Sequence, residues 1–368
     1  MKVAIIHDWL TGMRGGEKCL EVFCELFPSA TVFTLVYIKG TVSETIERMD
    51  IKTSFIQHFP DIEKKYRYYL PLMPKAIEQF DLTGYDLILS SSHCVAKGVK
   101  VPENSLHICY CYTPMRYIWD MYEQYFGDSR FYIKFAMKMI KPYLRKWDVE
   151  NSENVNYFIA ISECVKERIK RHYNREADVI YPPVDTDFFI PFTRYPLPST
   201  DYYLIVSAFA PYKKVDLAVE TFNKLKLPLK IIGSGQDEKK LKRIAGKNIE
   251  FLGWRNNDEL RKYYQNCRAV IFPGEEDFGI VPVEAQACGK PVIAYKKGGV
   301  LETMIDGKTG IFFNEQTAES LSASVLKFEN MKFNSREVRE PAERFGRKKF
   351  SELIKNYIDE KLKKRYNQ

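Results

Sequence analysis

The sequence predicts an α/β fold of two domains, because one type of unit recurs along it. Each unit is a short apolar strand, a loop rich in glycine or proline, and a helical pattern. Such units start near residues 2, 202, 229 and 269. A length of 368 residues suits two domains with full-sized cores, although one large domain would also fit.

The composition is that of an ordinary soluble globular protein, with 45% hydrophobic and 28% charged residues. No apolar run reaches the roughly 18 residues of a transmembrane helix. Met1 leads straight into a strand pattern instead of a signal peptide. The eight cysteines contain no CxxC pair, which favours small core residues in a reducing cytosol. The net charge of +8 favours an anionic partner, namely a nucleotide, a nucleic acid or a membrane surface. No nucleic-acid reader motif is present, so we expect no nucleic acid as partner.

The first unit is a strand at residues 2–7, followed by a loop that ends in Gly15 and Gly16 at the start of a helical pattern. This order of strand, glycine and helix is typical of an approach to phosphate. The loop matches neither the Walker sequence nor G-x-G-x-x-G. It is therefore either a tight turn or a ligand site.

Two further strands of the first half end in polar residues. A strand at residues 85–90 delivers His93 to its carboxyl end, and a strand at residues 106–110 leads into CYTPMRYIWD, which contains Tyr112. A tyrosine can donate or accept a hydrogen bond, but it does not take up a proton near neutral pH. His93 is either a ligand contact or a satisfied turn residue.

Basic and aromatic residues are interleaved at residues 59–80, and cations recur at helical spacing at Lys134, Lys138, Lys141 and Arg145. We expect the second segment to form a helix that kinks or ends near Pro142. Its cations either form a solvated helix face or attach the chain to an anionic membrane surface.

Prolines crowd residues 185–200, where we expect the linker between the domains. The second half restarts with a strand at residues 202–207 and a loop that carries Lys213 and Lys214. These lysines either neutralise a diphosphate or are solvated.

The stretch FPGEEDFGIVPVEAQACGKPVIA, residues 272–294, holds Glu276 in a loop and Glu284 eight positions later. We expect a helix from about Pro282, with Glu284 in its first turn. Carboxylates at such a place either bind the paired hydroxyls of a sugar or cap the helix.

This stretch resembles the E-x7-E motif of the retaining GT-B glycosyltransferases of family 4. The Phe-Gly-x-x-Pro between the glutamates and the Ala-x-x-Gly-x-Pro-Val-Ile after them also match. The resemblance implies an α/β GT-B fold of two Rossmann-like lobes facing across a cleft, with a C-terminal helix crossing back to the first lobe. The implied domains are an acceptor-side domain at residues 1–185, a donor domain at residues 186–338 and a terminal helix at residues 339–368.

The resemblance also assigns roles to residues. Glu276 would contact the donor hexose, Glu284 the nucleotide ribose, and Lys213 the phosphates, with Lys214 as an alternative. Ala208 stands where the family has an arginine, so one donor cation is missing or is supplied by Lys214 or Arg14. The remaining implied donor contacts are the backbone N–H groups of Phe278, Gly279 and Ile280, and in addition Gly15, Gly16, Gly233, Gly235 and Trp254.

Tyr112 stands where the family often has a histidine that contacts the donor sugar, and His93 is the substitute that we weigh against it. The TPMRY and PYK-x-VD stretches resemble mannosyltransferases of surface-polysaccharide assembly. They imply transfer of mannose from GDP-mannose to a glycan or lipid-linked glycan, with retention and without metal or cofactor. The implied location is the cytoplasm, with peripheral contact at the inner face of the membrane as a further option. A UDP-sugar donor, a GT-B sugar-nucleotide epimerase and a non-catalytic member remain alternatives.

Overall fold

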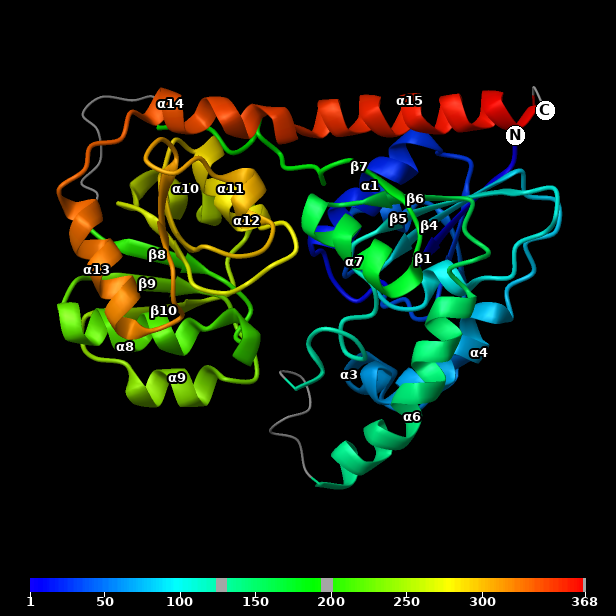
Figure 1. Cartoon of the computed structure of the whole chain (residues 1–368), viewed down its shortest axis with the longest axis horizontal. Coiled ribbons are helices and arrows are strands. Elements are labelled where there is room, and N and C mark those ends of the chain that lie inside the picture. The colour runs from blue at the N-terminus through cyan, green and yellow to red at the C-terminus, as the bar shows by residue number, and fades with distance from the viewer. Residues whose placement is uncertain (124–130, 193–200, 367–368) are drawn as a thin grey trace. The chain divides into compact units, whose positions relative to one another are not determined.

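The computed structural model describes residues 1–123, 131–192 and 201–366, and it consists of two compact units (Figure 1). Unit 1 contains Met1–Pro183 and Lys348–Gln368, and unit 2 contains Val184–Arg347. Each unit is a parallel sheet with helices on its faces, so the predicted α/β class is confirmed.

The sheet of unit 1 has seven parallel strands in the order β3-β2-β1-β4-β5-β6-β7. Strands β1, β4 and β5 are buried along their whole length, as expected for central strands of a parallel sheet covered on both faces. In the register of the central pair, Ile5 lies opposite Leu89. The strands are β1 (Val3–His7), β2 (Thr31–Thr34), β3 (Asp50–Thr53), β4 (Leu87–Ser92), β5 (Leu106–Cys111), β6 (Tyr157–Ala160) and β7 (Ala177–Val179).

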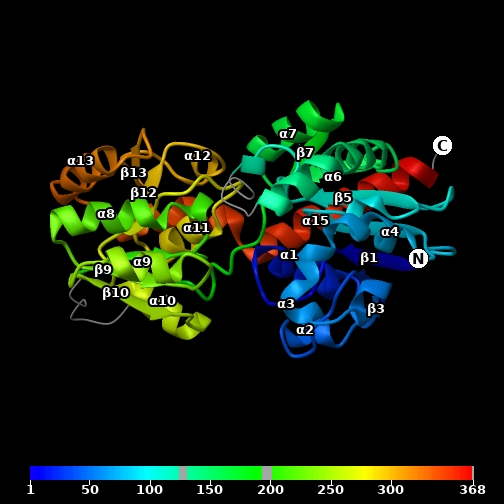
Figure 2. The same ribbon diagram turned by 90° about the horizontal axis from the view of Figure 1, so that it is seen from below.

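Helices cover both faces of this sheet (Figures 1 and 2). One face holds a core that includes Ile6, Met73, Leu144 and Trp147. On the other face Phe23 packs against Tyr110 and against Phe350 of the terminal helix. The helices are α1 (Gly15–Leu26), α2 (Glu44–Glu47), α3 (Ile62–Lys65), α4 (Met73–Glu78), α6 (Phe131–Glu150), α7 (Glu163–Tyr173) and α15 (Arg347–Tyr366), with 3-10 turns η1 (Phe55–His58), η2 (Tyr66–Leu72) and η3 (Ala96–Gly98).

The sheet of unit 2 has six parallel strands in the order β10-β9-β8-β11-β12-β13. This is the strand order of a dinucleotide-binding Rossmann domain. The strands are β8 (Tyr203–Val206), β9 (Leu229–Ile232), β10 (Ile249–Gly253), β11 (Val270–Phe272), β12 (Val292–Tyr295) and β13 (Gly310–Phe313).

The helices of unit 2 also form two layers, with α8 and α9 on one face of the sheet and α10 and α11 on the other (Figure 1). The core of this unit includes Phe222 of α8, Leu241 of α9 and Leu321 of α13. The elements are η4 (Pro211–Lys213), α8 (Val215–Leu225), α9 (Glu238–Ile244), α10 (Asn257–Asn266), α11 (Ile280–Ala287), α12 (Val300–Thr303), α13 (Ala318–Glu329), α14 (Ser335–Arg339) and η5 (Glu340–Phe345).

Two segments differ from what the sequence pattern indicates. Helix α6 continues through Pro142 to Glu150 and does not end at the proline. The terminal segment from residue 339 is not one helix, because a 3-10 turn precedes Gly346 and α15 starts only at Arg347. Residues 193–200 of the expected linker lie outside the described residues. Directly before that linker, Val184 donates its N–H to the carbonyl of Phe345, and unit 2 starts at Val184.

Candidate active site

Each sheet has a switch point, where the strand order reverses and a crevice opens beyond the carboxyl ends of two neighbouring strands. In unit 1 it lies between β1 and β4, and in unit 2 between β8 and β11. Ligands of open α/β sheets bind at these points. The predicted residues His93 and Tyr112 belong to unit 1, and Lys213 and Glu276 belong to unit 2.

An ion pair joins the two sides of the switch point in unit 2. Lys213 ends the turn after β8, and Glu276 lies in the loop after β11. The Lys213 Nζ lies 2.5 Å from Oε1 of Glu276, and the two side chains are 15% and 24% exposed. The structure therefore brings together two residues that lie 63 positions apart (276 − 213) and that the sequence predicts on separate motifs. A phosphate arriving here would compete with Glu276 for the ammonium group of Lys213.

Close backbone packing fixes the loops around this ion pair. A Cβ on Gly274 would lie 3.0 Å from Cα of Lys213. A Cβ on Gly298 would lie 2.4 Å from the carbonyl oxygen of Glu276, and Gly298 has a φ of +79°. Gly299 donates its N–H to the same carbonyl at 2.8 Å. The glycines thus hold Lys213 and Glu276 at fixed positions, because any side chain would push the loops apart.

The glycine loop after β9 belongs to the same rim. Gly233 has a φ of +138°, and a Cβ there would lie 1.8 Å from the carbonyl oxygen of Ser207. Phe209 donates its N–H to the carbonyl of Ser234 at 2.9 Å. Gly233 and Gly235 therefore have a structural reason to be glycine, whether or not a ligand approaches them.

The helix after Glu276 begins two residues earlier than the sequence predicts. Gly279, with a φ of +89°, is the N-cap, and α11 starts at Ile280. Pro282 is thus the third helical residue, where its missing N–H is still one that the helix would leave unpaired. Glu284 consequently lies in the second turn, which corrects the predicted first-turn position.

Glu284 is 3% exposed, and Oε2 of its carboxylate accepts a hydrogen bond from the hydroxyl of Tyr264 at 2.9 Å. Phe278 is also buried and packs against Phe345 with ring centroids 5.3 Å apart. Neither side chain lies on the surface with Lys213 and Glu276. The ribose contact of Glu284 stays a prediction, and a ligand would have to reach its carboxylate inside the unit.

Two other predicted donor contacts of unit 2, Trp254 and Lys214, lie at the surface. Trp254 follows β10 and is 74% exposed. Lys214 and Ala208 are exposed in the loops after β8. Lys214 has left-handed backbone, with a φ of +54°, and it caps α8. The side chain of Lys214 is thus far more exposed than that of Lys213.

In unit 1 the switch point is built around a buried carboxylate, Asp8, directly after β1. The carboxylate accepts hydrogen bonds from four consecutive backbone N–H groups of residues 93–96 at 2.7 to 3.0 Å. Nδ1 of His93 lies 2.9 Å from Oδ2 of Asp8. Burial by itself would raise the pKa of Asp8, but His93 and the hydrogen bonds outweigh it and hold that pKa at about 2.

Asp8 orients His93 at the rim of the sheet. The His93 and Trp9 rings pack in a T-shaped arrangement with centroids 4.5 Å apart, and the His93 side chain is 28% exposed. With Nδ1 facing Asp8, Nε2 is the ring nitrogen left for other contacts. Nε2 accepts a hydrogen bond when the imidazole is neutral and donates one when it is protonated. His93 can therefore make a polar contact with a ligand.

Tyr112 is held inside unit 1. Its hydroxyl donates to the carbonyl of Gly16 at 2.8 Å and lies 2.8 Å from Oγ of Ser91. Burial raises the pKa of Tyr112 well above its ordinary range. This hydroxyl links the first turn of α1 to β4. Tyr112 as a whole is only 9% exposed. Gly16 itself does not require glycine for packing, since an added Cβ would make ordinary contacts of 3.5 Å with His7 and Tyr112.

Asp8 is the residue that the sequence interpretation missed. It stands in His7-Asp8-Trp9, directly after a buried apolar strand. An acidic residue at the carboxyl end of a central strand is a signal that could have been used. The role of its partner loop, however, depends on the pairing of β1 with β4, which are about eighty residues apart.

Within residues 1–123, 131–192 and 201–366, no group of three or more His, Cys, Asp or Glu side chains could hold a metal ion. In the same part of the chain, no helix combines the length and the apolar character needed to cross a bilayer. All eight cysteines are free thiols, and all but Cys164 are buried, as the sequence predicts for core residues.

Two family models match this chain, one in each half. The family model "Glycosyltransferase Family 4" matches residues 28–188, and the model "Glycosyl transferases group 1" matches residues 194–349. Together they cover both units. The chain belongs to the family 4 type of glycosyltransferases.

Among the curated relatives of this family 4 chain is an uncharacterized glycosyltransferase of Methanocaldococcus jannaschii. It is 31% identical over 214 residues, which are 57% of this chain and 58% of the relative. The GDP-mannose-dependent α-(1-6)-phosphatidylinositol monomannoside mannosyltransferase of Mycolicibacterium smegmatis is 28% identical over 170 residues, 39% of this chain and 44% of the relative. The alignments thus span less than two thirds of these relatives.

Among solved structures, HepE of Anabaena in complex with UDP superposes with a TM-score of 0.71. The match covers 98% of this chain and 100% of HepE at 15% sequence identity. At that identity the likeness establishes the fold. The family 4 chain therefore has the GT-B fold that the E-x7-E resemblance predicts.

Proposed function

We propose that this chain is a retaining, metal-independent glycosyltransferase that moves a hexose from a nucleotide-sugar to a hydroxyl group of a glycan or lipid-linked glycan. The observation that carries the proposal is the pairing of Lys213 with Glu276 across the switch point of unit 2. One ammonium group and one carboxylate at the same point suit the two halves of a nucleotide-sugar. The diphosphate takes the cation, and the sugar hydroxyls take the carboxylate.

In the proposed reaction Lys213 stabilises the negative charge that develops on the departing nucleoside diphosphate. Once the diphosphate binds Lys213, Glu276 is released to accept hydrogen bonds from the hexose. No carboxylate is assigned as a nucleophile, and retention rests on the resemblance to the retaining family.

GDP-mannose is the proposed donor. It is supported by the TPMRY and PYK-x-VD stretches and by the mannosyltransferase among the relatives. A UDP-sugar is the second candidate, because HepE was solved with UDP and with UDP-glucose. We propose a cytoplasmic location, with the acceptor presented at the membrane.

The donor proposal is tested by thermal unfolding and calorimetry with GDP, UDP, ADP, dTDP and their common sugars. A ligand that binds only the folded chain at about 100 times its Kd stabilises it by about 2.7 kcal/mol. We expect GDP and GDP-mannose to raise Tm selectively. Selective stabilisation by UDP-sugars would mean that the donor is a UDP-sugar and not GDP-mannose. The chain would still be a glycosyltransferase. A change of the donor sugar in the absence of any acceptor would indicate an epimerase, and no response to any nucleotide would indicate a non-catalytic member.

We further propose that His93, and not Tyr112, makes the polar contact that the family's histidine makes. The Tyr112 hydroxyl already has partners in Gly16 and Ser91, whereas His93 is oriented by Asp8 and partly exposed. We expect His93→Ala to lower kcat about tenfold, the value of one hydrogen bond of about 1.5 kcal/mol. Tyr112→Phe should lower Tm and leave kcat within about twofold.

Steady-state kinetics at saturating donor, together with Tm for both variants, checks this assignment. The pair is matched, since each variant removes one polar group from the same end of the unit 1 sheet. If Tyr112→Phe loses much of its kcat while His93→Ala stays active, Tyr112 and not His93 makes this contact.

A further inference from the structure

Helix α6 carries half of the large apolar side chains that are exposed in the described part of unit 1. Four of them follow one another at steps of four residues, so they form a single row along the helix. We call this the apolar row, and its members are Phe131 (82% exposed), Phe135 (66%), Met139 (67%) and Tyr143 (53%). A row of this size, concentrated on one helix, is unlike the single exposed apolar residues that are normal on a protein surface.

The other side of α6 explains why the row faces outward. Met137, Leu144 and Trp147 are buried in the core of unit 1. Asp148 is fully buried, and its carboxylate accepts hydrogen bonds from Lys97, Trp119 and Tyr173 at 2.7 to 2.8 Å. These contacts fix the rotation of the helix, so the apolar row cannot turn into the core.

Cations flank the apolar row along the same helix. Lys134, Lys138, Lys141 and Arg145 follow at steps of four, three and four, and ideal helical geometry places them next to Phe131, Phe135 and Pro142. Three of these cations line a cavity of about 560 Å³ together with Tyr122, Glu123 and Pro142. The cavity lining thus carries three cations and one carboxylate.

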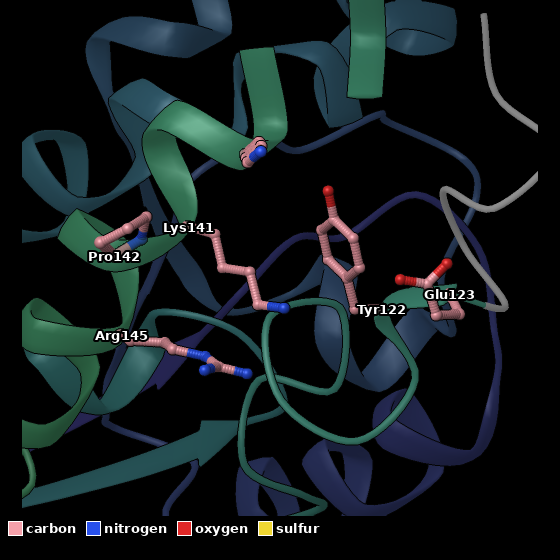
Figure 3. A pocket seen from close by; sticks show the side chains of 6 residues that line it. Tyr122, Glu123, Lys141, Pro142 and Arg145 are labelled. Carbon is pink, nitrogen blue, oxygen red and sulfur yellow. The ribbon is translucent and has the colours of Figure 1, made fainter. Parts of the chain in front are cut away.

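Figure 3 shows Lys141 and Arg145 reaching from α6 toward Tyr122 and Glu123. The Nζ of Lys141 lies 3.9 Å from the centroid of the Tyr122 ring. Arg145 Nε donates to the carbonyl of Ile118 at 2.7 Å, and its guanidinium lies over Trp119 at 4.6 Å. Burial and the neighbouring Arg145 lower the pKa of Lys141. An anionic group in this cavity would relieve the repulsion between the two cations.

We propose that the apolar row and the adjacent cationic cavity form a docking surface for a bilayer that contains anionic phospholipid. The apolar row inserts at the boundary between headgroups and acyl chains, and the cations receive lipid phosphates. Charge complementarity favours a bilayer over a second copy of the chain, because two copies would bring like charges together. The inference deepens the membrane part of the proposed function, but it rests on α6 alone.

The test is co-sedimentation with vesicles of phosphatidylcholine and of phosphatidylglycerol mixed with phosphatidylcholine in equal parts. We expect the wild-type chain to bind the anionic vesicles more tightly, with affinity falling as salt rises. Lys138→Gln combined with Lys141→Gln should weaken this binding about 25-fold, since each cation near such a surface is worth about a factor of five. Phe135→Ser combined with Met139→Ser should weaken it at least about tenfold.

Two matched controls alter chemistry of the same kind elsewhere. Lys348→Gln combined with Lys355→Gln removes two exposed lysines from α15, and Leu326→Ser removes an exposed apolar residue from α13. Both should bind vesicles as the wild type does. Equal losses in the controls and the α6 variants, or no vesicle binding by the wild type, would overturn the proposal.

Sedimentation velocity separates the remaining outcome. If the wild type is a dimer that the Phe135 and Met139 variant dissociates, the surface is an interface between copies and the membrane proposal is wrong. The nucleotide thermal shift is measured on every variant. A variant that keeps the nucleotide-induced rise of Tm but loses vesicle binding has lost only the function of this surface. Vesicle binding without any nucleotide response would contradict the enzyme proposal and leave the membrane proposal standing.

Discussion

Lys213→Ala should lower kcat of glycosyl transfer by about 10²–10³, the loss seen when one preorganised charge-stabilising donor is removed from an active site. The reason is the position of the ammonium group at the switch point of unit 2, where it pairs with Glu276 at 2.5 Å. The side chain is only 15% exposed, so solvent screens its charge less than that of a surface lysine. The measurement is the steady-state rate of product formation with the donor found in the binding panel.

The neighbouring residue supplies the matched control. Lys214→Ala removes the same charge one position later from an exposed side chain, and we expect kcat to change less than about threefold. Equal losses in the two variants would mean that the loop contributes only its net charge. A fully active Lys213→Ala would remove Lys213 from the chemistry.

A substitution of Glu276 tests whether a diphosphate displaces this carboxylate from Lys213. Glu276→Gln frees the ammonium group and keeps the size of the side chain. If a diphosphate must displace Glu276, this variant should bind free nucleoside diphosphate at least as tightly as the wild type while turning over the sugar more slowly. The two effects have opposite sign, so a general disturbance of the loop would not reproduce them.

Local signals predicted much of this architecture. Apolar runs of four to six residues marked most of the central strands, and glycine-rich loops marked the carboxyl ends where the candidate residues lie. The E-x7-E spacing predicted the Glu276 loop and the helix after it. The helix start was wrong by two residues, because the left-handed conformation of Gly279 ends the loop and residue order alone does not reveal it.

What the sequence could not predict depends on contacts between elements that are distant in the chain. Glu284 was expected in the first turn of the helix, but it lies in the second turn, inside unit 2 and against Tyr264 of α10. For the same reason, the sequence could not decide whether Tyr112 or His93 takes the place of the family's histidine. Only the pairing of β1, β4 and β5 shows that the Tyr112 hydroxyl meets Gly16 and Ser91, while His93 meets Asp8.

Asp8→Asn should lower the free energy of unfolding of unit 1 by about 3–5 kcal/mol at pH 7, the range for breaking a buried charged pair. Its carboxylate is fully buried and accepts hydrogen bonds from the backbone of residues 93–96. An asparagine can accept with one oxygen, but its NH₂ group would face N–H donors that then lose their partner. The turn that carries His93 should therefore loosen, and kcat should fall with it.

The effect of Asp8→Asn should also depend on pH in a defined direction. The pKa of Asp8 is lowered from 3.8 to about 2 in the folded chain, so the folded state favours the ionised carboxylate. The ionised carboxylate therefore stabilises the folded chain above pH 4, and this stabilisation is lost as the pH falls through about 2. The part of the free energy of unfolding that depends on this ionisation is about 2.5 kcal/mol. The difference in stability between wild type and variant should shrink over that window.

Denaturant unfolding followed by tryptophan fluorescence measures this difference for unit 1, because Trp9, Trp119 and Trp147 lie in unit 1 and Trp254 is exposed in unit 2. Asp50→Asn is the control, an exposed carboxylate of the same sheet that should change stability by less than about 0.5 kcal/mol. A constant difference between wild type and Asp8→Asn from pH 7 to pH 2 would show that packing of the side chain, and not its charge, holds the turn. In that case the orientation of His93 would have to come from its contact with Trp9 alone.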